Sequence, residues 1–276
     1  MQGRISTSLK LIYFTFFKNP KSLSNEKLEA RLRARVHGIE KQGLDEESTD
    51  FASMIIGRKL FHEAKSRKLL SDEEIIWCER VLFGKDTIKE IQKISDKIDE
   101  NLFEIIKNRR SVRSWQEGKI TDNEMKMLVE AAKWAPSSSH RQTWHFLLTR
   151  DIEKIKIISK IRGQRFVNKS TNCIIVLINI EAYDDIESEY TPYLDAGAAI
   201  QNLLLMAHTI GLGACWVNFG KYEIPNQDDM EKIKDLFNIP KNFKIVSIIP
   251  IGRLPSRTFN APGRKASEDI MHIEEF

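Results

Sequence analysis

One segment, residues 194–210, limits the possible folds more than any other, because it is apolar on nearly every side of a helix. Ala198, Ala199 and Ile200 are followed by the apolar run 203–207, which leaves no broad polar stripe to face water. A helix of this kind has to be buried on several sides. Gly211 and Gly213 mark its end. Because one small layer of sheet and helices could not cover so many faces, we expect the helix to pack against a second copy of the chain.

Strand patterns occur only after residue 100. Residues 145–149 and the continuous apolar run 173–180 are typical of strands, and further strands are expected at 214–219 and 244–251. Helices are expected at 102–106, from a capping box at 121–124 to before Pro136, at 194–210 and at 228–237. Few connections suggest a regular parallel winding. The pattern therefore predicts an α+β fold, with a mixed sheet flanked by helices.

The first hundred residues show helix patterns and no strand pattern. Helices are expected at 26–37 and 48–66, and a capping box, Ser71-Asp-Glu-Glu74, opens a third. Isoleucines at 88, 91, 94 and 98 predict a fourth. We therefore divide the chain into a helical extension, residues 1–100, and a second part, residues 101–276. Since helices this short make a bundle of marginal stability, we expect the extension to dock on the second part.

Charge is spread evenly along the chain. Of the charged residues, 19 basic and 17 acidic ones precede residue 101, and 24 and 22 follow, so that each part carries +2 of the net +4. A nucleic-acid-binding module would concentrate its positive charge. We therefore expect no nucleic-acid partner.

The cysteines and the N-terminus bear on location. Cys78, Cys173 and Cys215 lie far apart, which fits neither a disulfide framework nor a zinc site and suits a reducing cytoplasm. The apolar stretch 11–17 is too short for a membrane span and lacks a cleavage site after it. We expect it to pack against the protein rather than to touch a membrane, and we expect a cytoplasmic protein.

No familiar catalytic motif is present: there is no GxSxG, no HExxH and no Walker lysine motif. Three other features stand out. They are the arginine cluster Arg109-Arg-Ser-Val-Arg113, the turn from Pro136 to Gln142 with its serines, and the buried helix with the glycines after it.

Taken together in this order, these features resemble the nitroreductase family. The resemblance rests on the arginine cluster, on Ala135-Pro-Ser-Ser-Ser-His-Arg-Gln-Thr-Trp-His-Phe146, on Asp195 to Leu204 with Gly211-Leu-Gly-Ala-Cys-Trp216, and on Ile249-Pro-Ile-Gly252 followed by Arg264. It extends over residues 101–276. It implies an FMN cofactor at the interface of a homodimer.

The resemblance assigns roles that suit the chemistry of the residues. Arg109, Ser111 and Arg264, with Arg110 beside them, would bind the FMN phosphate through guanidinium and hydroxyl donors. Arg113 would reach the pyrimidine edge of the flavin ring, where a positive charge stabilises the anionic reduced flavin. The same edge would contact Pro136, Ser137, Ser138, His140 and Gln142. The backbone around Trp216, Val217 and Asn218 would donate an N–H to flavin N5.

Two positions depart from the family pattern. His140 stands where the family usually has asparagine, and Thr143 stands where it usually has proline. A histidine lacks the paired donor and acceptor of an amide, so its flavin contact is less well defined than the phosphate contact of Arg109. Elsewhere, Trp144 and Trp216 are expected in the core or at an interface. Cys215 is interpreted as a small buried thiol, and His37 with Glu40 as structural.

The expected reaction is that of the family. NADH or NADPH would reduce flavin N5 by hydride transfer and leave, and a small-molecule acceptor such as a nitroaromatic, quinone or enone would then take the electrons in a ping-pong sequence. No protein side chain is assigned a catalytic role. Two alternatives stay open: a flavin enzyme of another specificity, for example dehalogenation or metabolite oxidation, and a non-catalytic flavin-binding scaffold. The extension would either narrow acceptor entry or widen the dimer interface.

Overall fold

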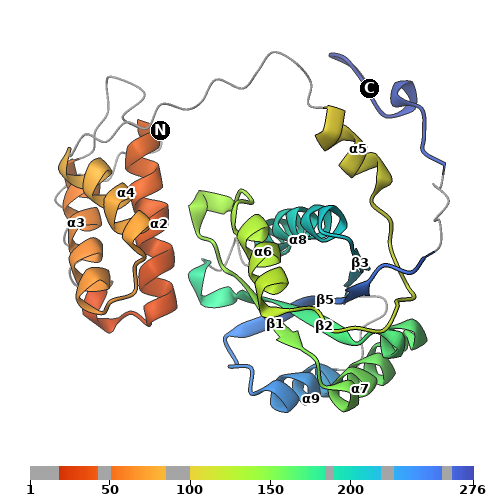
Figure 1. Cartoon of the computed structure of the whole chain (residues 1–276). Helices are drawn as coiled ribbons and strands as arrows, with labels where there is room; N and C mark the ends of the chain where they lie inside the picture. The colour runs from red at the N-terminus through yellow and green to blue at the C-terminus, as the bar shows by residue number, and fades with distance from the viewer. Residues whose placement is uncertain (1–18, 43–50, 85–99, 184–188, 219–226, 257–262) are drawn as a thin grey trace.

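The computed structural model describes residues 19–42, 51–84, 100–183, 189–218, 227–256 and 263–276. Within them a five-stranded sheet is covered by helices on both faces (Figure 1). The expected strands are present as β1 (Trp144–Thr149), β2 (Asn172–Asn179), β3 (Leu212–Ala214), β4 (Val217–Asn218) and β5 (Phe243–Arg253). The order is β1-β2-β5-β3, with β4 also paired to β5. The α+β class is confirmed.

All pairs of these strands are antiparallel, and the parallel contact in the described chain is an isolated bridge between Ser111 and Ala214. The single strand expected at 214–219 is wrong in detail, because it is divided into β3 and β4. Both pieces keep one register on β5, with Ala214 opposite Ile251 and Val217 opposite Ile248. Between them the Cys215 N–H donates to the carbonyl of Pro250. Proline has no N–H to return, so the ladder is interrupted there.

Alternate residues of β2 face two separate cores, which explains why its sequence is apolar throughout. Ile174, Val176 and Ile178 pack with the helices α6 (Asp122–Lys133) and α8 (Thr191–Thr209). Cys173 and Ile175 pack on the other face, towards α7 (Ile152–Arg162) and α9 (Gln227–Phe237). Figure 1 shows the sheet between these two layers.

Helix α8 is buried along most of its surface, as its composition predicts, but not on all of it. Pro192, Ala196 and Ile200 are buried, whereas the side chain of Leu194 is 72% exposed. Two further apolar side chains at this end, Tyr190 and Tyr193, are also exposed. The described residues of the single chain therefore leave the first turn of α8 exposed.

The extension forms a core of its own. Its helices are α2 (Asn25–Gln42), α3 (Phe51–Ser66) and α4 (Asp72–Phe83), preceded by the short helix η1 (Pro20–Ser22). The capping box of Ser71 and Glu74 is confirmed at the start of α4. Leu28, Leu32 and Leu60 are buried between the helices.

The extension also contacts the second part of the chain. The Ser24 hydroxyl donates to Glu181 at 3.0 Å. Ala30 packs with Ala182 and Tyr183, near the short helix η4 (Ile180–Ala182). The docking expected from the sequence is therefore observed for α2. The boundary at residue 100 stays a prediction.

The remaining elements are α5 (Glu100–Asn108), η2 (Ser138–His140), η3 (Arg165–Lys169) and η5 (Ser267–Asp269). Two sequence predictions concern residues that lie outside the described ones. They are the apolar stretch 11–17 and the helix carrying isoleucines 88–98. None of the described helices is both long and apolar enough to span a membrane.

Candidate functional site

The arginine cluster follows α5 and is fixed against β3. The Val112 N–H donates to the Ala214 carbonyl at 3.0 Å, next to the bridge between Ser111 and Ala214. This approach requires glycine at 213, since a Cβ there would lie 2.7 Å from the Val112 side chain. The cluster and the glycines after α8, far apart in sequence, thus form one structural unit.

Arg109 and Arg110 line a cavity of about 180 Å³ with Leu204, His208 and Pro255, which we call the arginine cavity. Burial lowers the pKa of Arg109, and the nearby positive charges of Arg110 and Arg264 lower it further. Among the described residues, none of the groups that shift the pKa of Arg109 is a carboxylate. Arg264 therefore lies near enough to act on Arg109 but does not line the arginine cavity, and the convergence of the two residues on a phosphate stays a prediction.

Arg110 adds a second sign of an anion site. Its Nε atom is buried and has no hydrogen-bond partner within the described chain, although its Nη1 atom donates to the Arg109 carbonyl at 2.9 Å. A buried donor without an acceptor is costly. An anion in the arginine cavity would relieve both the unmet donor and the repulsion between guanidinium groups.

A second cavity of about 500 Å³ lies on the other side of this strand segment, and we call it the tryptophan cavity. It is lined by Arg113, Arg162, Gln164, Phe166, Cys215, Trp216, Val217 and Asn218. The guanidinium of Arg113 lies 5.6 Å from the centre of the Phe166 ring. Arg162 is buried and donates to the Asn218 carbonyl at 2.8 Å, which fixes the β4 backbone. The four predicted residues Arg113, Trp216, Val217 and Asn218 are thus brought together.

Cys215 lines the tryptophan cavity and is buried. Its pKa is raised by burial, while Arg113, Arg109 and a hydrogen bond with Ser111 act in the opposite direction. The net effect keeps the thiol protonated, in agreement with its interpretation as a small buried side chain. Ser111 therefore contacts Cys215, and its predicted place at the phosphate with Arg109 stays a prediction. Trp144 is buried in the core on the α8 side of the sheet.

The turn from Pro136 to Gln142 is held by hydrogen bonds that begin and end within it or on α8. The Ser138 N–H donates to Asp195 Oδ1 at 2.9 Å, and the Gln142 N–H donates to the Ser137 hydroxyl at 3.0 Å. Ser139, His140 and Gln142 all have a positive φ, between 49° and 56°. Each such residue costs about 1–3 kcal/mol and persists only where its surroundings impose the conformation. The turn is therefore a strained segment with specific support.

Among the described residues, those of the turn line neither the arginine cavity nor the tryptophan cavity. Asp195 contacts the turn and His208 lines the arginine cavity, and both belong to α8. They are 13 residues apart (208 − 195), which corresponds to about 20 Å along a helix. The tryptophan cavity is nearer to the turn, because the Trp216 ring lies near Gly197, two residues after Asp195. The meeting of the turn and Arg113 at one flavin edge stays a prediction.

Instead, His140 and Gln142 line a third cavity, of about 710 Å³, between the second part of the chain and the extension. We call it the extension cavity. The His140 ring lies 5.3 Å from the Trp77 ring and 5.7 Å from the His37 ring, measured between centroids. Burial and the nearby His37 and Arg33 lower the pKa of His140. His37 and Glu40, interpreted as structural from the sequence, line this cavity.

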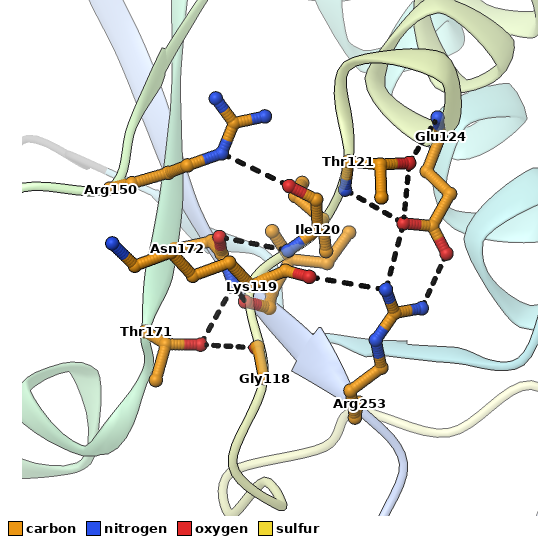
Figure 2. Close-up of polar contacts among 10 residues, drawn as sticks. Gly118, Lys119, Ile120, Thr121, Glu124, Arg150, Thr171, Asn172 and Arg253 are labelled. Carbon is orange, nitrogen blue, oxygen red and sulfur yellow. Dashed lines mark hydrogen bonds and ion pairs between the residues drawn. The ribbon is translucent and has the colours of Figure 1, made fainter.

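The segment after the arginine cluster is anchored to the sheet by a polar network (Figure 2). Arg253 donates to the Glu124 carboxylate and to the Lys119 carbonyl. The Ile120 N–H donates to buried Asn172 at 3.1 Å, and Thr171 donates to the Gly118 carbonyl at 2.8 Å. These bonds fix residues 118–124, and with them the path of the chain that leaves Arg113.

Several residues of the cavities were not identified from the sequence, namely Arg162, Phe166 and Trp77, together with the supporting residue Asp195. Asp195 carried a usable signal, because it is one carboxylate within an otherwise apolar helix. Trp77 and Phe166 carried none, since an aromatic residue at helical spacing is usually part of a core. In the described part of the chain, no group of three metal-ligating side chains occurs.

Comparison with known proteins identifies the family. A model of the Nitroreductase family matches residues 106–172 and 164–253. A relative from Methanothermobacter thermautotrophicus, provisionally named an NADH dehydrogenase/NAD(P)H nitroreductase, is 30% identical over 200 residues, which cover 71% of this chain and all of the relative. The NADPH-dependent FMN reductase of Bacillus subtilis is 24% identical, over 60% of this chain and 69% of that protein.

Solved structures agree with the sequence matches. A protein of Desulfovibrio desulfuricans, provisionally named a nitroreductase and solved in complex with FMN, superposes with a TM-score of 0.54 at 27% identity, over 65% of this chain and 99% of that one. A protein of Bacteroides thetaiotaomicron superposes with a TM-score of 0.56, also at 27% identity, over 65% of this chain and all of that one. The family model, the relatives and the fold lead to the same conclusion: the chain belongs to the Nitroreductase family.

Proposed function

We propose that this chain is an FMN-dependent oxidoreductase of the cytoplasm that uses NADH or NADPH to reduce a small organic acceptor such as a nitroaromatic, a quinone or an enone. The observation that carries the proposal is that Arg109 and Arg110 line one cavity and that Arg264 also acts on the Arg109 charge, with no carboxylate among the described groups that shift the pKa of Arg109. The FMN complex of the Desulfovibrio relative supports the choice of cofactor.

The donor set fits a phosphate monoester. Guanidinium groups bind phosphate through paired N–H donors, and a dianion would offset the repulsion among the three arginines. The buried Arg110 Nε would gain an acceptor. Arg109, Arg110, Ser111 and Arg264 would thus hold the phosphate end of FMN.

The tryptophan cavity would take the flavin ring. Arg113 would place a positive charge beside it, which favours negative charge on the pyrimidine edge. The backbone of Trp216, Val217 and Asn218 would lie against the ring, in an orientation fixed by the bond from Arg162 to the Asn218 carbonyl. When bound, FMN supplies the chemistry of accepting a hydride from NADH or NADPH and passing electrons to the acceptor.

A second copy of the chain would complete the site. In one chain, the described residues that line the arginine cavity and the tryptophan cavity do not include Pro136, Ser137, Ser138, His140 or Gln142. A homodimer formed through the uncovered side of α8 would bring the turn of one subunit to the tryptophan cavity of the other. The exposed side chains of Leu194, Tyr190 and Tyr193 support an interface there.

The test is spectroscopic and kinetic. The purified protein should be yellow, with the absorbance of oxidised FMN, and should convert NAD(P)H, a proton and a quinone into NAD(P)⁺ and the hydroquinone. Bound FMN without any NAD(P)H oxidation, across quinone and nitroaromatic acceptors, would favour a non-catalytic scaffold. A colourless protein that binds no added FMN would overturn the proposal.

A further inference from the structure

We propose that the extension cavity binds the organic electron acceptor, as an uncharged planar aromatic molecule with polar substituents, and that Trp77 determines which acceptors bind. The inference rests on the proposed function, because it names the acceptor site of that reaction. It assigns a role to the extension, which lies before the residues matched by the family model.

The position of the cavity connects it to the proposed ring site. His140 and Gln142 form part of its wall and belong to the turn that would contact the flavin ring of the partner subunit. A ligand that touches these two side chains would therefore lie beside the ring. The other wall comes from α2 and α4, which lie before the residues matched by the family model. Acceptor preference could thus differ from that of the relatives.

The extension wall is held in place by its own polar contacts. Trp77 Nε1 donates to Glu40 at 3.1 Å, and the same carboxylate is paired with Arg80. Arg33 is paired with Glu74 at 2.7 Å. Because these contacts fix the Trp77 indole before any ligand arrives, the ligand loses less free energy in ordering the site.

The charges on the wall balance. The cations are Arg33, Arg80 and Lys133, and the carboxylates are Glu40, Glu73 and Glu74. A ligand with a large net charge gains little from such a surface. The imidazole rings of His37 and His140 and the Gln142 amide offer hydrogen bonds to carbonyl or nitro oxygens. The low pKa of His140 keeps that ring uncharged at neutral pH.

The size of the extension cavity and the aromatic residues that line it suit a flat ligand. About 710 Å³ is within the range of small-molecule sites. Trp77 lies in one wall, and Trp134, whose side chain is 74% exposed, lies at the rim on the other part of the chain. Indole rings on two sides favour a flat aromatic ligand, because offset or edge-on ring contacts are attractive.

The test compares Trp77→Leu with Trp77→Phe in the full-length, FMN-loaded protein. Binding of menadione, a planar quinone, to the oxidised protein is measured by calorimetry without NAD(P)H. The leucine variant should bind menadione about tenfold more weakly, the upper range of one aromatic contact. The phenylalanine variant, which keeps a ring, should stay within about twofold. The KM for menadione should change in parallel, whereas turnover with the small inorganic acceptor ferricyanide should not.

Phe83→Leu is the matched control, because Phe83 belongs to the same helix but packs on Phe61 rather than lining the cavity. An unchanged menadione affinity in Trp77→Leu, with full FMN content, would overturn the inference and leave the proposed function standing. Equal weakening by Trp77→Leu and Phe83→Leu would overturn it as well, since it would reflect a loosened extension. Absence of FMN from the unaltered protein would overturn the proposed function itself and the acceptor role with it.

Discussion

The ring of Trp77 meets the ring of His140 edge-on, at a centroid separation of 5.3 Å, so that a residue of the extension rests on the turn of the proposed flavin site. His140 replaces the asparagine usual in the family. Its Nε2 atom also lies 2.8 Å from the Gln142 amide nitrogen. The histidine therefore gives up an amide's paired hydrogen bonds but gains an aromatic contact with a segment outside the family match.

This relationship predicts coupling between the two residues. Trp77→Leu and His140→Asn should each lower the free energy of unfolding. The double variant should lower it by less than the sum of the two single losses. The coupling free energy should be about 0.5–1.5 kcal/mol, typical of an aromatic pair. Urea unfolding of the four proteins measures it. The pair Phe83→Leu and His140→Asn should be additive, and additivity for Trp77 as well would contradict the contact.

Replacing Arg109 with alanine should weaken FMN binding by about ten- to a hundredfold, because a charge-assisted hydrogen bond is worth about 1.5–3 kcal/mol. Titration of the apo-protein with FMN gives the dissociation constants. Lys156→Ala, which removes a positive charge from the exposed surface of α7, should leave the affinity unchanged. Equal affinities for Arg109→Ala and the unaltered protein would remove Arg109 from the cofactor site.

Strongly patterned elements could be predicted from the sequence. Both capping boxes start helices as expected, and β2 and β5 follow from their long apolar runs. Helix α7 was missed because isoleucines at 152, 155, 157, 158 and 161 fit neither a helical nor a strand period cleanly. Its ends did carry signals, since Asp151 caps the first turn and Gly163 adopts the left-handed conformation after the last.

The candidate site was predictable in its local parts but not in its assembly. The family resemblance grouped Arg109, Ser111 and Arg113 with residues 216–218 around one cofactor, and in the structure the close packing of Val112 on Gly213 holds the two segments together. It also grouped the turn at 136–142 with them, whereas the turn lines neither of their cavities in a single chain. The contact of His140 with Trp77 could not be predicted, since it depends on how two helical units dock.

The uncovered end of α8 predicts a dimer that a single charge can disrupt. Leu194→Glu should give a monomer at micromolar concentration and should lower FMN affinity, because a buried unpaired carboxylate is costly at an interface. Light scattering and FMN titration are the measurements. Ile157→Glu places the same charge on exposed α7 and should change neither. A stable monomer of the unaltered protein that holds FMN would contradict the dimeric site.

The ion pair of Arg253 and Glu124 predicts an acid-dependent loss of stability. The hydrogen bond from Arg253 is the largest cause of a Glu124 pKa of about 2, well below the usual 4.5 of a glutamate. The ionised carboxylate is therefore favoured in the folded state, and its stabilisation is complete above pH 4.5 and lost as the pH falls towards 2. Since the pair is partly exposed, it should contribute at most about 1 kcal/mol. In urea unfolding, the Glu124→Gln variant should have the same free energy of unfolding as the unaltered protein near pH 2 and a lower one at pH 7. A deficit that is the same at both pH values would exclude the ion pair as its cause.

Substitutions at buried Asp195 and at Tyr183 should distinguish loss of support for the turn from loss of overall stability. Its Oδ1 atom accepts the Ser138 N–H at 2.9 Å, and its Oδ2 atom accepts the Tyr183 hydroxyl at 2.7 Å. Asp195→Ala leaves the Ser138 N–H without its acceptor, whereas the Tyr183 hydroxyl can still donate to Thr143 Oγ1 at 2.6 Å. The substitution should therefore cost about 1–3 kcal/mol and also weaken FMN binding by releasing the strained turn. Tyr183→Phe removes the Oδ2 bond but keeps the bond to Ser138. It should lower the free energy of unfolding by about 1 kcal/mol and leave the FMN dissociation constant within about twofold. Comparing FMN titrations with urea unfolding for the two variants separates the effects, and an equal loss of FMN affinity in both would show that Asp195 acts on overall stability rather than on the turn.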